Sequence, residues 1–142
     1  MADEQQTPEP PVDLTEEQLE FLASMFDLAR SGKGDELLAL VDQGIPPNLT
    51  NSSGDTLLIL AAYHDQADLV RGLLERGAET DRENDRGQTA VGCAVFRQNE
   101  EITRLLLDAG ADPHQGRQNP YAVIEVFGIE KMKPLLDEYA AS

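Results

Sequence analysis

A 33-residue period constrains the fold of this chain more than any other feature of its sequence. Glycine recurs at this interval at Gly44, Gly77 and Gly110. Apolar residues keep the same spacing: Ala29, Ala62 and Val95, and Leu40, Leu73 and Leu106. A fixed period of this length indicates a small structural unit stacked on copies of itself. Such a stack has a long surface and no deep pocket, so its first expected function is partner binding rather than catalysis.

The composition predicts an aliphatic, helical core. The chain has 142 residues, which suits one domain, and 40% of them are hydrophobic. Aromatic residues make up only 5% and Trp is absent, so Leu, Ala, Val and Ile must fill the core. Ala and Leu are also strong helix formers.

The charge limits the kinds of partner. The net charge is −16, from 27 acidic and 11 basic side chains. A charge of this sign repels phosphate backbones and anionic surfaces, so we expect neither a nucleic acid nor a membrane as a partner. It favours solubility and attracts a basic protein, and the alternative is an ordinary solvated acidic surface, as many soluble proteins have.

The single cysteine and the first residues favour a cytoplasmic protein. Cys93 lies in the apolar run 90–95, which predicts a small buried hydrophobic residue rather than a reactive thiol. The opening Met-Ala-Asp-Glu-Gln-Gln has neither a basic nor an apolar signal region, so we expect no secretory signal. The longest apolar stretch, 57–63, is too short to span a bilayer.

The first helix can be placed from its cap. Residues 1–13 are acidic, rich in Pro and almost free of apolar side chains, which predicts a disordered tail. Thr15 and Gln18 fit a capping box that starts a helix over 16–30. The predicted apolar face of this helix contains Leu19, Leu22, Phe26 and Ala29.

The same signals repeat in the later units. Asp35 is the expected N-cap of a helix over 36–43. Further helix pairs are expected over 56–63 and 68–76, and over 89–97 and 100–109, each pair ending at a period glycine. Polar loops lie between the pairs, at 45–53, 78–86 and 111–119. The irregular last unit, 120–139, suits a cap because a terminal unit faces water on one side.

Four segments resemble the ankyrin repeat, in which a finger loop precedes two antiparallel helices. They read SGDTLLILAA (53–62) and RGQTAVGCAV (86–95) for the turn and first helix, and DLVRGLLERGAE (68–79) and EITRLLLDAGADP (101–113) for the second helix. The resemblance implies an all-α solenoid of stacked helix-turn-helix units with protruding finger loops over residues 14–142. Its units would span 14–50, 51–83, 84–116 and 117–142.

The family's Thr-Pro-Leu-His signature is altered in both central units. It reads Thr-Leu-Leu-Ile at 56–59 and Thr-Ala-Val-Gly at 89–92. The threonines can still cap their helices, but the histidine hydrogen bonds that link neighbouring units in the family are lost, so stability depends more on aliphatic packing. Gly72 and Gly92 inside helices each cost about 1 kcal/mol relative to Ala, and they permit close helix contact in return.

The resemblance also implies where a partner binds. In the family, contacts come mostly from the finger tips and the exposed side of the first helices. Either Tyr63 and Phe96, which are one period apart, anchor an interface, or they fill gaps between helices. The predicted binding residues are Ser52, Ser53, Asp55, Tyr63, His64, Asp85, Arg86, Gln88, Phe96, Arg97, Gln118, Asn119 and Tyr121.

The second finger carries alternating acids. Acidic side chains in a groove would steer a basic partner, and the alternative is that they are ordinary solvated loop charges. A calcium loop does not fit, because its sixth and twelfth positions, counted from Asp81, hold Arg86 and Gly92 instead of Gly and Glu. The alternating acids are Glu79, Asp81, Glu83 and Asp85.

No catalytic, cofactor-binding or metal-binding residues are predicted. His64, His114 and Cys93 do not have the spacing of a zinc site. The segment Ser-Gly-Lys-Gly at 31–34 lacks the rest of a phosphate-binding loop. We therefore expect that the protein is not an enzyme.

The leading expectation is a monomeric cytoplasmic adaptor, inhibitor or regulatory partner that holds another protein in a concave groove. Two alternatives stay open. One is an acidic decoy that neutralises a basic or nucleic-acid-binding protein through charge, with a steep dependence on salt. The other is an accessory subunit that stabilises an enzyme partner.

Overall fold

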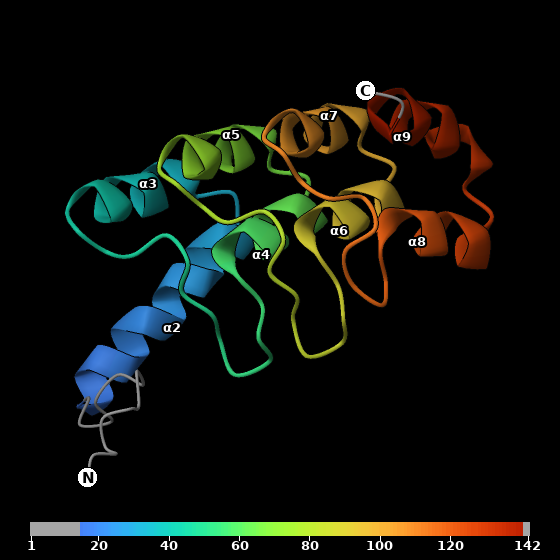
Figure 1. Cartoon of the computed structure of the whole chain (residues 1–142). Coiled ribbons are helices and arrows are strands. Elements are labelled where there is room, and N and C mark those ends of the chain that lie inside the picture. Colours follow the sequence, from blue (N-terminus) through green and yellow to red (C-terminus); the bar gives the residue numbers. More distant parts are fainter. Residues whose placement is uncertain (1–14, 141–142) are drawn as a thin grey trace, which may run out of the picture.

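Two rows of helices build the described part of the protein (Figure 1). The structure is a computed structural model and describes residues 15–140, so the predicted tail at 1–13 lies outside the described residues. The inner row consists of α2 (Glu16–Arg30), α4 (Leu57–Tyr63), α6 (Ala90–Phe96) and α8 (Pro120–Phe127). The outer row consists of α3 (Gly34–Asp42), α5 (Ala67–Glu75), α7 (Glu100–Asp108) and α9 (Lys133–Ala140), with the 3-10 helix η1 (Glu130–Met132) before α9.

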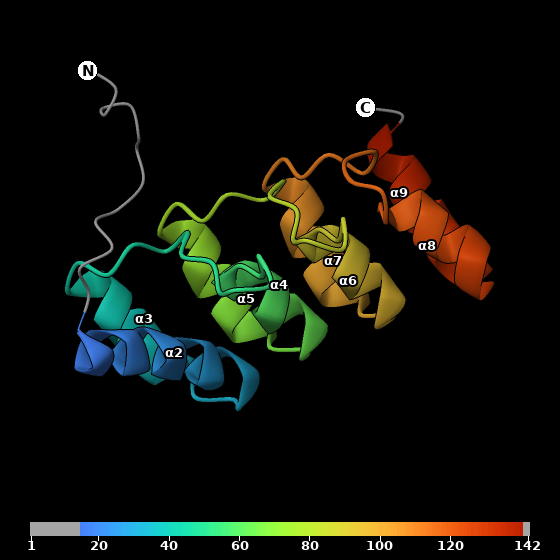
Figure 2. The ribbon, with the colours of Figure 1, turned by 90° about the horizontal axis from the view of Figure 1, so that it is seen from below.

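Each helix packs against the next member of its own row. In the inner row α2 contacts α4, α4 contacts α6 and α6 contacts α8, and in the outer row α3 contacts α5, α5 contacts α7 and α7 contacts α9. Figure 2 shows the successive helix pairs side by side, with the pair α2 and α3 at one end and the pair α8 and α9 at the other. The predicted all-α stack is therefore confirmed.

Side-chain caps start the inner helices where the sequence predicts them. The Thr15 hydroxyl accepts from the Gln18 N–H at 3.0 Å and the Thr15 N–H donates to the Gln18 side chain at 2.9 Å, which confirms the capping box. Thr56 and Thr89 cap α4 and α6 in the same position of the period. The period glycines end the outer helices with the positive φ that favours glycine: 119° at Gly44, 89° at Gly77 and 99° at Gly110.

Two expectations about the N-terminal helix pair are wrong. α3 begins at Gly34, so Asp35 lies inside the helix, and Lys33 at the N-cap position makes no side-chain cap. Glycine suits this start because a methyl group at position 34 would lie 3.1 Å from Cβ of Leu69, closer than ordinary packing. Leu19 is 52% exposed instead of buried, because the first turns of the long helix α2 extend beyond α4 (Figure 1).

The core is aliphatic, as predicted. Ala29, Ala62 and Val95 are fully buried in consecutive inner helices, and Leu73 and Leu106 are fully buried in outer helices. Small side chains on the inner helices allow these helices to approach one another closely. Of the residues that the structure describes, Phe26 is the one buried aromatic side chain.

Gly72 and Gly92 both stand at close contacts. A methyl group at Gly72 would overlap the Leu38 side chain of α3, so glycine here allows α5 to approach α3. A methyl group at Gly92 would lie 2.6 Å from the backbone carbonyl oxygen of Gln118. Glycine in α6 therefore makes room for a loop rather than for another helix.

Three finger loops project from the inner row on the same side (Figure 1). We call residues 45–55 the first finger, 78–88 the second finger and 111–118 the third finger. The third finger is shorter than the second: Thr89 follows the cap Thr56 by 33 residues, but the next cap, Asn119, follows Thr89 by only 30. Within residues 15–140, each helix is too short or too polar to cross a bilayer.

Candidate functional site

Three exposed aromatic rings stand in line at the ends of α4, α6 and α8. The rings of Tyr63 and Phe96 are nearly parallel, with centroids 6.2 Å apart and planes at 6°. Phe127 meets Phe96 edge to face, with centroids 5.0 Å apart. The three side chains are 38%, 36% and 55% exposed, whereas most large apolar residues of the stack are buried. We call Tyr63, Phe96 and Phe127 the aromatic row.

Polar side chains fix the Tyr63 end of the aromatic row. The Arg97 guanidinium lies over the Tyr63 ring, 5.6 Å from its centroid, and His64 meets the same ring edge to face at 5.2 Å. Arg97 also bonds Asp65 at 2.7 Å, and Asn99 bonds Asp65 at 3.1 Å. Partial burial opposes ionisation of Asp65, but the hydrogen bonds from Arg97 and Asn99 outweigh it and lower the pKa of Asp65. Arg97 is therefore held in place by a fixed charge.

A small hollow of about 150 Å³ opens beside the aromatic row, and we call it the notch. All three rings line it, so the row forms one of its walls. Gln88 of the second finger and Gln118 of the third finger contribute amide groups to the lining. The buried residues Gly92 and Cys93 of α6 and Val123 of α8 complete it.

Cys93 is buried at the notch, with 3% of its surface exposed, as the sequence predicts. Burial disfavours the thiolate, and the nearby Asp55 carboxylate adds to this effect, so the pKa of Cys93 rises to about 12. The thiol is therefore neutral at physiological pH.

The raised pKa of Cys93 predicts a loss of stability in alkali. In the unfolded chain the thiol loses its proton near 9.0, whereas the folded protein holds it up to about 12. Below pH 9.0 the thiol is protonated in both states, and its contribution to the free energy of unfolding does not change with pH. Between pH 9.0 and about 12, the free energy of unfolding falls by about 1.4 kcal/mol per pH unit. Urea unfolding at about pH 8.5 and about pH 10.5 should show about 2 kcal/mol more loss for the wild type than for Cys93→Ala. Equal losses would show that the native thiol titrates normally.

The predicted contact residue Asp55 holds the fingers together instead of facing solvent. It is 8% exposed, and its carboxylate accepts from the Asn84 side chain at 2.8 Å. Asn84, which is 5% exposed, also accepts from the backbone N–H groups of Arg86 and Gln88, at 2.9 Å each. Asn84 thereby joins the first finger to the second.

Most of the acids in the second finger bond neighbouring groups. Asp81 accepts from the backbone N–H of Asp112 at 2.9 Å, and Glu83 accepts from the Gln115 side chain at 2.7 Å, both in the third finger. Glu79 pairs with Arg82 at 3.2 Å. No group of three or more His, Cys, Asp or Glu residues within 15–140 could hold a metal ion.

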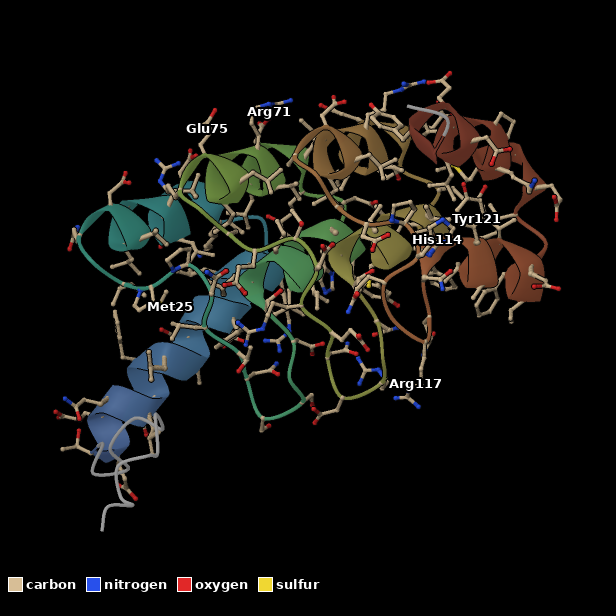
Figure 3. All side chains as sticks on the ribbon, viewed as in Figure 1. Met25, Arg71, Glu75, His114, Arg117 and Tyr121 are labelled. Atoms are coloured by element: carbon tan, nitrogen blue, oxygen red, sulfur yellow. The ribbon has the colours of Figure 1, made fainter. Side chains whose placement is uncertain are left out.

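The remaining predicted residues divide into three groups. Asn119 caps α8 by accepting from the Ala122 N–H at 2.9 Å. Tyr121 stacks on His114, with ring centroids 5.2 Å apart (Figure 3). Its hydroxyl donates to Asp137 of α9 at 3.1 Å, so this side chain bonds within the last helix pair. Ser52, Asp85 and Arg86 are exposed on the fingers, and Ser53, Gln88 and Gln118 are half-buried there.

Sequence reasoning missed Phe127 and Asn84. One period after Phe96 lies Ile129, which is buried, because the short third finger shifts the register of α8. Aligning the caps Thr89 and Asn119 instead of counting residues places Val126 at the position of Phe96, and Phe127 lies one residue later, at the end of α8. Asn84 follows Asn51 by one full period, and this repeated Asn is the signal that could have identified it.

Comparisons with known proteins agree with this architecture. A family model described as ankyrin repeats, in 3 copies, matches residues 25–116. The chain is also 51% identical over 65 residues to a Pseudomonas aeruginosa protein whose name describes it as an ankyrin repeat protein. The aligned segment spans 46% of this chain and 37% of that relative's length.

Proposed function

Because this chain belongs to the ankyrin repeat family, whose repeats are generally protein-interaction modules, we propose that it binds another protein in one particular groove. This groove comprises the notch, which the second and third fingers line through Gln88 and Gln118, and the aromatic row beside it. The single observation that carries the proposal is the aromatic row. Aromatic side chains are among the strongest anchors of protein interfaces, and here they are exposed along the groove.

The lining of the notch supports recognition through apolar contact rather than through net charge. Among residues 15–140, no charged residue lines the notch. The acids Glu79, Asp81 and Glu83 already bond groups of the second and third fingers. The acidic-decoy alternative therefore gains no support from the residues around the aromatic row.

Truncating the aromatic row should weaken partner binding while leaving the fold intact. The partner is first identified by affinity purification from native lysate and mass spectrometry, and is then purified. We expect the double variant Tyr63→Ala and Phe96→Ala to raise the Kd by about 10–100-fold, because each ring removed is an exposed interface anchor. Calorimetric titration measures the Kd, and circular dichroism should show unchanged helicity.

A matched control lies at the other end of the stack. Phe21 in α2 is an exposed aromatic residue away from the groove, 43% exposed, so Phe21→Ala should leave the Kd unchanged. Binding should change little with salt. A Kd that rises steeply with salt and is insensitive to the double variant would support the acidic decoy instead.

A further inference from the structure

We propose that the notch receives one uncharged side chain of Phe or Leu size from a partner segment, while Gln88 and Gln118 bond the backbone of that segment. This inference rests on the proposed function, because it names the chemistry of the partner at the same groove. It concerns the notch alone, which would hold one side chain of the partner.

The volume of the notch sets the size of its occupant. An apolar cavity of about 150 Å³ accommodates benzene, and the notch has a volume of about 150 Å³. It therefore has room for one Phe ring or one branched aliphatic side chain. A Trp side chain is too large, and an Ala side chain would leave most of the hollow empty.

The lining of the notch sets the polarity of its occupant. Three aromatic rings and the side chains of Cys93 and Val123 present apolar surface, and no charged side chain of the described part of the chain lines the hollow. A Lys or Glu side chain entering here would lose its hydration, and none of the residues that line the hollow carries an opposite charge to compensate. An aromatic or aliphatic side chain loses only unfavourable contact with water, and an aromatic one can also meet the rings edge to face.

The side-chain amides of Gln88 and Gln118 determine which groups of the partner can hydrogen-bond next to the side chain in the notch. The Gln88 side-chain oxygen accepts from Asn84 at 2.7 Å and from Arg86, whereas its NH₂ group has no partner among residues 15–140. The Gln118 NH₂ group donates to the Arg86 carbonyl at 2.9 Å, whereas its side-chain oxygen has no partner in the same described range. The notch is thus edged by one available donor and one available acceptor. A peptide group, which carries one acceptor and one donor, matches this pair.

The backbone holds these two glutamines in fixed positions. The Gln118 N–H donates to the Gly87 carbonyl at 2.9 Å, which pairs the ends of the second and third fingers. The Gln118 carbonyl lies against Gly92 of α6, where any side chain would displace it. The spacing between the two amides is therefore set before a ligand arrives, which lowers the entropic cost of binding.

A peptide selection on the full chain tests this inference without knowledge of the natural partner. The probe is a random peptide display library, panned against the wild-type protein. We expect the enriched peptides to share one Phe, Leu, Ile or Met position. Changing that position to Lys should weaken binding by about tenfold or more. On addition of such a peptide, the amide NMR signals of Gly92, Gln118 and Val123 should shift.

Variants of the protein locate the anchor. Phe127→Ala removes a wall of the notch and should weaken the selected peptides by about tenfold, and Gln118→Ala should weaken them by about threefold through the lost backbone bond. Phe21→Ala makes the same chemical change on α2 and should have no effect. Unchanged melting curves for the variants show that they are folded.

Two outcomes would overturn the inference. Enriched peptides without a shared apolar position contradict the anchor, and peptides that bind Phe127→Ala as tightly as the wild type place the anchor outside the notch. If the native partner still depends on Tyr63 and Phe96 in either case, the proposed function stands and only this inference fails. If the native partner is indifferent to the aromatic row but the selected peptides depend on Phe127 and Gln118, the proposed function fails and the notch still binds its predicted ligand.

Discussion

Asn84→Ala is expected to lower the free energy of unfolding by about 3 kcal/mol, the largest loss that we predict for a single polar side chain of this protein. The substitution removes the hydrogen bond to the buried Asp55 carboxylate and leaves the N–H groups of Arg86 and Gln88 without their acceptor. Each buried polar group left unsatisfied costs about 1–3 kcal/mol. Urea unfolding followed by circular dichroism measures the loss.

The equivalent residue of the first finger provides the control for this prediction. Asn51 is only half-buried, and its side chain lies 3.4 Å from Asp55, a longer contact than the one from Asn84. Its oxygen accepts from the N–H groups of Ser53 and Asp55 at 2.9 and 3.0 Å. Asn51→Ala should therefore cost about 1 kcal/mol, because water can replace part of what is lost. Equal losses for the two variants would show that the link between fingers contributes nothing beyond the local turn.

Gly92→Ala is expected to destabilise the protein by about 2 kcal/mol, although Ala is the better helix former. The new methyl group would lie 2.6 Å from the Gln118 carbonyl oxygen. This oxygen belongs to the backbone of the third finger, so the whole loop must move to relieve the overlap. The same movement should open the pairing between Gln118 and Gly87 and weaken ligand binding at the notch.

Gly72→Ala is the matched control, because it makes the same change in an outer helix. Its methyl group would meet the ends of the Leu38 side chain, which is half-buried and can rotate. The gain in helix propensity, up to about 1 kcal/mol, should offset the cost of that rotation. Thermal melting should show a clear drop in Tm for Gly92→Ala and almost none for Gly72→Ala. If both variants lost equal stability, backbone crowding at Gly92 would not be the cause.

Much of the fold could be predicted from the sequence because its signals are local. Thr15, Thr56 and Thr89 cap helices through their own side chains, and the period glycines end helices through their own backbone, so each is visible in a short window. The family resemblance is confirmed by the match over residues 25–116. The start of α3 was missed because Lys33 at its N-cap makes no side-chain cap, so the local signal at Asp35 was misleading.

The site was less predictable because it depends on contacts between units. Tyr63 and Phe96 follow from the period, but Phe127 depends both on the shorter third finger and on the extra residue of α8. The sequence places Asp55 at a finger tip, and only the structure shows that Asn84 of the next finger covers it. Solvent exposure of a loop residue is decided by its neighbours in space, and one sequence contains no record of them.

Because the third finger is short, the last repeat unit is not a copy of the unit before it. The third finger is three residues shorter than the second and α8 is one residue longer than α6, and Phe127 at the end of α8 lines the notch. A redesign that restored an ideal repeat there would yield a more regular array and would change the notch that we propose as a binding site. The notch depends on the irregular last unit, so duplication of the central unit alone would not reproduce it.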